Sequence, residues 1–526
     1  MDHSQHVCSP ECFGIGRRRF LQGASALAAV SVAGCSGDLA SPMVANTALP
    51  EIKRSFLLTN GFVMPMNSER TYFPNGAIAV VDGEIRAVGE SDVLKPKYPQ
   101  LPEINAQGHL VLPGFIDTHI HDWYALRHDS SLPDFNQPHR HSSFSRGGDF
   151  QGLAQFGDLL LSVQDRILGD DERHAAALLM TLDLIKSGTT CGIDAGSGSA
   201  GPLAQAFVDI GMRGAVTELA GDVIPLANGG FERNQDADEL AARMEKTISD
   251  WHGKHNRVRV LSGVLYNVFG SDELIGNMQA LSQRHGIKLS THMAALSNED
   301  RMSVATFGRP VYERLESLGV VGPNLLACHM GFIEDELIPK VAASGAGCNY
   351  APVGSGTIGV RYPIDNVHPR LWGMGGKVAV ATDGGQAQPA TMLGAARAAY
   401  LQHNIAANQE GVITPYKALE LATIDSARVA GWDNEIGSLE PGKRADIVLH
   451  DVSDDRYDGL GDPVFTFFMR GERADVRTVI VDGEVILHNG TATRVDETLL
   501  RRNARSAIRA VGLRVDAVRT AVEVFS

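Results

Sequence analysis

The central part of the chain alternates short apolar runs with amphipathic helical segments, and this alternation limits the possible folds more than any other feature. Residues 172–187 and 272–285 have helical periodicity, and the strand-like runs 188–194 and 288–291 follow them directly. The pattern extends over roughly residues 113–430. Repeated strand–helix units of this length favour a parallel α/β sheet, either closed into a barrel or open and doubly wound. Periodicity alone does not choose between these two forms.

Two β-rich regions flank this central stretch. Asp82-Gly83 and Asp482-Gly483 each separate two strand-like runs, one pair near either end of the chain. The Asp-Gly dipeptide is typical of a tight β-hairpin turn. Because the termini of a domain commonly lie close together, we expect both regions to contribute to one composite β-module.

The N-terminal residues have the pattern of an export signal. Three arginines at positions 17–19 precede an apolar run over residues 24–33, which predicts a twin-arginine signal. This run is too short for a permanent span, which needs about 20 apolar residues. Residues 32–35 resemble a lipobox, so Cys35 is a candidate lipid anchor, with ordinary cleavage nearby as the alternative. We therefore expect a periplasmic protein, or one anchored on the outer face of the cytoplasmic membrane.

Composition limits the kinds of partner. The 526 residues carry a net charge of −15 with acidic residues spread along the chain, which argues against a nucleic acid partner. A small-molecule substrate is compatible with this balance. Cys191, Cys328 and Cys348 lie in apolar strand-like runs and are predicted to be buried packing residues. A homo-oligomer is an expectation that the sequence leaves open.

The segment from Pro113 to His121 is the strongest chemical signal. It is an apolar strand that ends in His119-x-His121, so the two-residue period of a strand points both imidazoles to one face. Two neutral imidazoles on one side form half of a zinc-type site. Barrel enzymes keep their chemistry at this carboxyl end of the strands.

Three further polar residues end apolar strands of the same repeating stretch. They are His292, His329 and Asp383. Taken singly, each is more simply a structural histidine or a turn aspartate. Together with the His-x-His pair they form an ordered set, in which every member ends a strand, and this set predicts a functional site.

Four segments carry a resemblance to a known family. They are PGFIDTHIH from residue 113, SGTT from residue 187, TDGG from residue 382 and GSLEPGKRADI from residue 437. They resemble the amidohydrolase superfamily and, more narrowly, its cytosine deaminase and atrazine chlorohydrolase-like branch. The resemblance implies a distorted (β/α)8 TIM barrel with a small β-sandwich made from both ends of the chain. The expected division is a signal at 1–35, a linker at 36–53, the sandwich at 54–112 and 436–495, the barrel at 113–435, and a C-terminal helix at 496–526.

The resemblance also implies a metal site. His119, His121, His292 and Asp383 would bind the metal, and His329 would hydrogen-bond the attacking water or the substrate. Binuclear members carry a carboxylated lysine on the fourth strand, and the corresponding run at 258–265 has no lysine. One divalent metal is therefore expected, zinc first, with iron and manganese as alternatives. In this scheme Asp383 and His329 are the catalytic residues, and Asp383 moves a proton from water to the leaving group.

One position departs from the resembled branch. Its deaminases usually read His-x-x-Glu, whereas this chain has Ala295 at the glutamate position, and Glu299 is a candidate substitute. The loss of that acid favours hydrolysis of an amide, carbamate, urea or cyclic amide in a small cyclic or aromatic molecule. A heterocycle deaminase or dehalogenase of the same superfamily stays open as an alternative. So does a catalytically silent scaffold or binding protein.

Several residues are candidates for the substrate pocket. Trp123, Tyr266 and Tyr350 follow strand ends and suit the walls of a flat pocket, although core packing explains each almost as well. The glycine-rich residues 354–359 correspond to a loop near the substrate in the resembled family. The polar stretch 127–151 has the length and composition of a lid.

Overall fold

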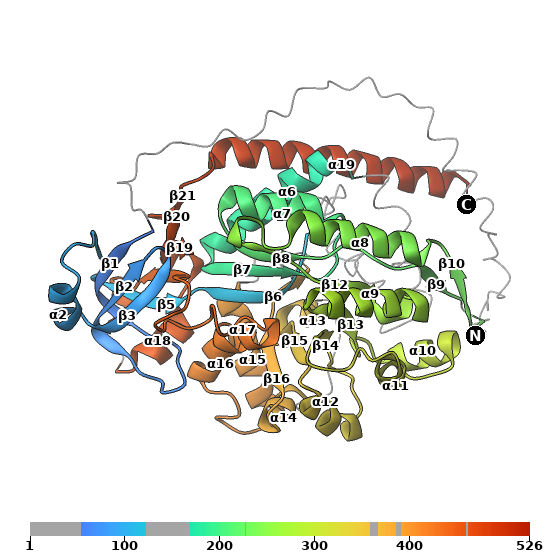
Figure 1. Cartoon of the computed structure of the whole chain (residues 1–526), viewed down its shortest axis with the longest axis horizontal. Helices are drawn as coiled ribbons and strands as arrows, with labels where there is room; N and C mark the ends of the chain where they lie inside the picture. The colour runs from blue at the N-terminus through green and yellow to red at the C-terminus, as the bar shows by residue number, and fades with distance from the viewer. Residues whose placement is uncertain are drawn as a thin grey trace, which may run out of the picture.

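The computed structural model describes residues 54–122, 168–226, 228–357, 367–384, 391–458 and 461–525 (Figure 1). The predicted signal with Cys35, the predicted lid and Trp123 lie outside these residues. No helix among the described residues is long and apolar enough to cross a membrane.

Ten strands of the central stretch form two five-stranded sheets, and all of their neighbouring strands are parallel. The first sheet has the order β11 (Val258–Val260), β8 (Arg213–Val216), β7 (Thr189–Asp194), β6 (Phe115–His121) and β17 (Asp383–Gly384). The second has the order β12 (Ser262–Tyr266), β13 (Leu289–Met293), β14 (Leu325–His329), β15 (Gly347–Tyr350) and β16 (Lys377–Val380).

The two sheets meet at short interruptions of the chain. Only Leu261 separates β11 from β12, and two residues separate β16 from β17. The run 258–265, expected as one strand, is therefore broken near its middle. The hydrogen-bonded ladder does not continue around all of the strands, so the described residues show two parallel sheets rather than one closed barrel.

Helices alternate with these strands, as the periodicity predicted. The predicted helix 272–285 is α9 (Asp272–His285), which begins where the Ser271 side chain accepts a hydrogen bond from the Leu274 N–H and ends at Gly286 in the left-handed conformation. The other helices that accompany the parallel strands are α6 (Asp170–Lys186), α7 (Ala200–Ile210), α8 (Ala237–Trp251), α10 (Glu299–Phe307), α11 (Val311–Ser317), α12 (Ile338–Ser344), α13 (Pro352–Thr357), α14 (Val367–Gly373), α15 (Met392–Ala406), α16 (Pro415–Leu421) and α17 (Ile424–Ala430).

Both ends of the chain build one nine-stranded sheet. Its order is β21-β20-β19-β18-β5-β1-β2-β3, with β4 paired to β1. The strands are β1 (Phe56–Val63), β2 (Phe73–Val81), β3 (Glu84–Glu90), β4 (Glu103–Asn105), β5 (His109–Pro113), β18 (Ile447–Asp451), β19 (Val476–Val481), β20 (Glu484–His488) and β21 (Thr491–Ala492). The antiparallel pair β5–β18 joins the two ends of the chain, as expected. The sandwich form and the exact domain boundaries stay predictions.

The two Asp-Gly dipeptides occupy the expected hairpin turns. Asp82 and Gly83 have φ angles of 52° and 78°, and Asp482 and Gly483 have φ angles of 55° and 76°. Two consecutive residues with positive φ are what a type I′ turn requires, and Gly adopts this conformation at little steric cost.

A direct chain connection and a buried ion pair join the nine-stranded sheet to the parallel strands. Gly114 lies between β5 and β6, where an added Cβ would stand 2.0 Å from the Thr190 Oγ1 atom. On β8, the Arg213 guanidinium donates two hydrogen bonds to the Asp446 carboxylate, and both side chains are buried. The remaining described helices are α2 (Ser91–Leu94), α18 (Pro463–Arg470) and α19 (Glu497–Phe525).

The three central cysteines are free and buried, as predicted.

Candidate active site and metal centre

Strand register brings the sequence-predicted residues to one edge of the sheets. His119 and His121 lie at the end of β6, His292 lies on β13 and His329 ends β14. Asp383 begins β17 and pairs with Ile120, the residue between the two histidines of β6. Parallel strands place their carboxyl ends at the same edge, which is why residues distant in the sequence meet here.

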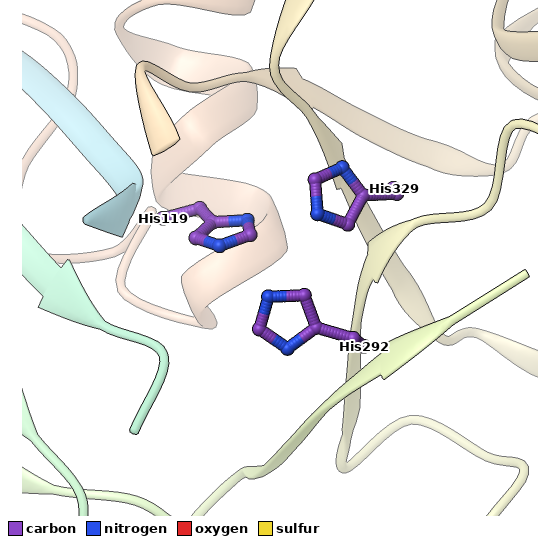
Figure 2. Close-up of side chains that lie close together, drawn as sticks. All are labelled: His119, His292 and His329. Atoms are coloured by element: carbon purple, nitrogen blue, oxygen red, sulfur yellow. The ribbon is translucent and has the colours of Figure 1, made fainter. Parts of the chain in front are cut away.

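The nitrogen atoms of the histidines face one another at short range. The Nε2 atom of His121 lies 3.0 Å from that of His119 and 3.3 Å from that of His292. The Asp383 Oδ1 atom lies 3.7 Å from Nε2 of both His119 and His121, and its Oδ2 atom lies 3.8 Å from Nε2 of His329. Figure 2 shows the rings of His119, His292 and His329 around a common space.

Hydrogen bonds on the far side of two rings fix their tautomers. The His292 Nδ1 atom lies 2.5 Å from the Leu265 carbonyl oxygen, an acceptor only, so Nδ1 carries the proton. His119 Nδ1 lies 3.2 Å from the Asn349 Oδ1 atom, and the Asn349 amide nitrogen donates to the Thr118 carbonyl at 2.9 Å. Asn349 therefore presents its oxygen to His119. In both rings the Nε2 lone pair is left free and points to the common space.

The donor set fits a divalent cation. Unprotonated nitrogens that face one another at 3.0–3.3 Å repel unless a cation lies between them. A tetrahedral ion with bonds of about 2.0–2.1 Å to nitrogen separates its ligand atoms by roughly 3.4 Å, close to this spacing. Burial lowers the pKa values of His121, His292 and His329, which favours the neutral imidazole that a metal requires. At His119 burial also lowers the pKa, but electrostatic interactions with Cys328 and Asp383 outweigh it and raise the pKa to about 10, so a metal must displace a proton from this ring.

Two overlapping groups of residues can hold the cation. One consists of His119, His292 and His329, and the other of His119, His121 and Asp383. Because His119 belongs to both, the groups describe one centre. The assignment of His329 to the substrate rather than to the metal stays a prediction.

The sequence profile of the amidohydrolase family matches residues 110–486 of this chain. The chain belongs to the amidohydrolase family. It is a metal-dependent hydrolase that acts on carbon–nitrogen bonds of small molecules, and this removes the silent scaffold as an alternative.

Two similar proteins are named as deaminases. The chain is 26% identical to the 5-methylthioadenosine/S-adenosylhomocysteine deaminase of Desulforudis audaxviator, in a match that covers 86% of this chain and 99% of the relative. It is 24% identical to the 5'-deoxyadenosine deaminase of Methanosarcina acetivorans, over 88% of this chain and 99% of the relative.

Solved structures of the family share the fold. An adenosine deaminase from Xanthomonas campestris with bound zinc superposes with a TM-score of 0.74 at 21% identity, over 88% of this chain and 98% of that one. The zinc complex of an atrazine chlorohydrolase from Arthrobacter aurescens gives a TM-score of 0.74 at 21% identity, over 86% of this chain and all of that one. The TIM-barrel-like α/β fold expected from the sequence is therefore that of this chain.

Buried polar residues lie behind the predicted metal ligands of this amidohydrolase. The Ser197 hydroxyl lies 3.3 Å from the His121 Nδ1 atom and donates to the Asp194 carboxylate. The Asp117 carboxylate accepts hydrogen bonds from the Thr382 hydroxyl and N–H, and burial raises its pKa to about 6. Such second partners orient a ligand ring and set its basicity.

Sequence reasoning missed these supporting residues. Asp194 ends an apolar strand and Asn349 lies one residue before the end of another, so the rule that found His292 and His329 also applies to them. Asn349 bonds to His119, and Asp194 holds the Ser197 hydroxyl that lies beside His121; both contacts with a histidine join distant parts of the chain, which periodicity does not reveal.

Gly354 positions Asp383 from the opposite side. A Cβ atom at Gly354, in α13, would lie 2.8 Å from the Asp383 Cβ and 3.0 Å from its Oδ2 atom. Asp383 itself has a φ angle of 67°, which is uncommon for a residue other than glycine. The glycine-rich segment therefore begins in direct contact with the carboxylate of Asp383, the predicted catalytic residue.

The aromatic pocket candidates differ in their surroundings. Tyr266 stacks on the ring of His292, with 4.3 Å between ring centroids and 17° between planes. Tyr350 is buried, its hydroxyl lies 2.9 Å from the His403 Nε2 atom, and its ring stacks on His368. His368 in turn donates to the His329 carbonyl at 2.7 Å. Tyr350 thus supports the site from behind, and contact of either tyrosine with substrate stays a prediction.

Apolar residues surround the alanine that replaces the branch's glutamate. Ala295 belongs to a buried cluster with Tyr266 and Leu296. Glu299, the candidate substitute, is buried at the start of α10, and burial raises its pKa to about 7. Its Oε2 atom accepts the Ala295 N–H at 2.8 Å and its Oε1 atom accepts the Asn267 amide at 2.5 Å. Both oxygens of Glu299 are thus engaged in holding the loop after β13.

Proposed function

We propose that this amidohydrolase cleaves an amide, carbamate, urea or cyclic-amide bond in a small cyclic or aromatic molecule, with one zinc ion at the histidine–aspartate centre. A bound zinc ion supplies a water of lowered pKa and polarises the attacked carbonyl. The observation that carries the choice of substrate class is Ala295, which leaves an apolar surface where deaminases of the branch carry an acid.

The remaining steps follow from residues of the chain. Asp383 accepts the proton of the attacking water and then transfers it to the leaving nitrogen. The two carboxylate oxygens of Asp383 face the Nε2 atoms of three histidines at 3.7–3.8 Å. Asp383 therefore borders the space in which the attacking water would bind. His329 donates a hydrogen bond to the oxygen on which negative charge develops.

Hydrolysis of an amide and deamination of an aminoheterocycle require different numbers of proton donors in the active site. Hydrolysis of an amide needs one proton delivered to the leaving nitrogen, and Asp383 supplies it. Deamination of an aromatic ring needs a further acid that protonates a ring nitrogen when water adds. Ala295 has no such group, and the carboxylate of Glu299 is occupied by backbone and amide donors.

A heterocycle deaminase is the second candidate. It is favoured by the names of the similar proteins, which act on adenosine derivatives. This activity would require Glu299 to release the Ala295 N–H and act as the ring acid. A dehalogenase, as the name of the Arthrobacter structure suggests, is a further form of the same alternative.

Product identification separates these candidates. Zinc-loaded protein would be incubated with separate panels of lactams, N-aryl carbamates, ureas and aminoheterocycles, and the products would be analysed by mass spectrometry. Products that contain one added water, whether ring-opened or split, are expected. Exchange of an amino group for oxygen with release of ammonia, in the absence of amide cleavage, would overturn the proposal in favour of deamination.

Three further features belong to the proposal. The two parallel sheets together make a distorted (β/α)8 barrel, and the nine-stranded sheet folds as a small sandwich. The protein is exported by the twin-arginine route, and Cys35 is acylated. Fractionation of cells that produce the wild type or Cys35→Ser tests the anchor, because only the wild type should sediment with membranes.

A further inference from the structure

A second cavity lies at the opposite end of the parallel strands from the metal centre. Its volume is about 200 Å³. It lies between the nine-stranded sheet and the start of β6, and its lining includes residues of α15 and the residues that follow α18. Figure 1 shows that β6 starts on the side of the nine-stranded sheet. Its lining residues include Phe115, Thr391, Arg397, His450, Glu472 and Arg473.

This cavity is separate from the catalytic site. Phe115 begins β6 and lines the cavity, whereas His119 and His121 lie toward the end of the same strand. Four residues of extended strand span about 13 Å, so a molecule in the cavity does not reach the metal ligands. The established reaction therefore makes no use of this space.

His450 is the feature that marks the cavity as a binding site. Its side chain on β18 is 1% exposed, and neither ring nitrogen has a hydrogen-bond partner among the described residues. It stands between the rings of Phe115 and Phe467, at centroid distances of 5.9 and 4.7 Å. Buried polar atoms without a partner are costly and rare, so an imidazole at this place calls for a hydrogen-bonding occupant of the cavity.

Positive charge faces the same space. Arg397 donates to the backbone carbonyls of Phe468 and Gly471. Glu472 and Asp475 act on its charge, but no carboxylate among the described residues forms an ion pair with it. Arg473 lies at the mouth, where 36% of its side chain is exposed, and it pairs with Asp183. Among the described lining residues Glu472 carries the only carboxylate, and its side chain is 65% exposed.

The amino end of a helix adds to the positive electrostatic potential in the cavity. Thr391 caps the 15-residue helix α15, and the first turn of that helix borders the cavity. The amino end of a helix carries partial positive charge and favours anions. Burial lowers the pKa of His450 to about 3, so its ring stays neutral and offers one donor and one acceptor.

We propose that this cavity binds a small oxyanion, either inorganic phosphate or a short carboxylate, with His450 as its hydrogen-bonding partner and Arg397 as the main positive charge. The two ligands share the same chemistry, since each offers anionic oxygens that accept from an imidazole N–H. The size of the cavity limits the occupant to a few non-hydrogen atoms and associated water.

Calorimetric titration of the zinc-loaded protein tests this proposal. Inorganic phosphate and acetate would be titrated separately into the wild type, into His450→Phe and into His488→Phe, a matched change of an exposed histidine on β20. The wild type and His488→Phe should bind one of the two anions, and His450→Phe should bind it at least 10-fold more weakly. Circular dichroism and thermal unfolding show that each variant is folded.

Two results would overturn the proposal. If the wild type and His450→Phe bind the anion equally, the anion binds at the metal centre and not in the cavity. If neither anion binds at concentrations 10-fold above physiological ones, the cavity contains only water. If His450→Phe does not fold, nitrogen NMR of the wild type decides the question. The nitrogen chemical shifts of one imidazole outside the metal centre should then change when the anion is added. The absence of such a change would contradict the proposal.

Discussion

At the scale of single residues, the position of the Asp383 carboxylate depends on the absence of a side chain at Gly354. A methyl group at Gly354 would overlap the Asp383 Cβ, which cannot rotate away because it belongs to the start of its side chain. We expect Gly354→Ala to displace Asp383 and to lower kcat about 100-fold, since misplacement by 1 Å costs this much. Gly276→Ala in α9 is the control, because nothing lies within 4 Å of its added Cβ. Equal kcat values for the two variants would show that Gly354 has no such role.

Glu299 separates the two candidate reactions at the same scale. A glutamine at this position keeps an oxygen for the Ala295 N–H but turns an amide donor toward Asn267. We expect Glu299→Gln to melt a few degrees lower and to retain kcat within about 10-fold, because the mechanism assigns it no proton transfer. Steady-state kinetics with the identified substrate measures this. A loss of 100-fold or more would identify Glu299 as a general acid.

His450 gives the protein a specific sensitivity to acid. Burial holds its pKa at about 3 in the folded state, whereas the unfolded chain takes up the proton near pH 6.5. Between these two pH values the unfolded chain therefore binds one proton more than the folded protein does. The free energy of unfolding accordingly falls as the pH decreases below 6.5. Relative to the wild type, His450→Phe should gain about 2 kcal/mol of stability between pH 7.5 and pH 5. Urea unfolding in buffers free of phosphate and carboxylate measures the free energy of unfolding of both proteins across this pH range. The prediction would be refuted if this free energy changed equally with pH in the wild type and in His450→Phe.

Chemically reactive residues were predictable from the sequence because each ends an apolar strand. The four histidines lie at or near the carboxyl ends of β6, β13 and β14, Asp383 follows β16 after two residues, and strand register brings all five together. The supporting contacts were not predictable in this way. The approach of Gly354 to Asp383 depends on how α13 packs against β17, and no local pattern encodes that distance.

At the scale of elements, the buried pair Arg213–Asp446 fixes β8 to the loop before β18. Both side chains are at most 4% exposed and share two hydrogen bonds. Arg213→Ala would leave Asp446 buried without its partner, so we expect a loss of about 3–5 kcal/mol in the free energy of unfolding. Arg86→Ala, which breaks an exposed pair with Glu84, should cost less than about 1 kcal/mol. Similar denaturation midpoints for the two variants would contradict this account.

Element boundaries followed the sequence where local chemistry sets them. The cap at Ser271 and the glycine at 286 define α9, and the Asp-Gly turns define both hairpins. The interruptions at Leu261 and after Val380 were not predictable. They arise because strands at the junctions of the two sheets change neighbours, and this depends on the curvature of the whole assembly.

At the scale of the whole molecule, the active centre joins parts of the chain that are far apart in sequence. His119 and Asp383 come from the first sheet and His292 and His329 from the second, so the donor set exists only when both sheets are folded against each other. A bound cation therefore links the two sheets, and chelation should remove activity and lower the melting temperature together. The nine-stranded sheet holds the start of β6, and with it the His-x-His pair, through β5 and Gly114.

The most direct test of the account is product analysis in ¹⁸O-labelled water, with zinc-loaded wild type and Asp383→Asn compared on the best substrate of the panel. The account predicts that the wild type incorporates one ¹⁸O atom at the former carbonyl carbon and releases the amine. Asp383→Asn should remain folded and be at least about 100-fold slower, because no carboxylate accepts the proton of the attacking water. Unchanged turnover by Asp383→Asn, or a product without ¹⁸O, would contradict metal-assisted hydrolysis at this centre.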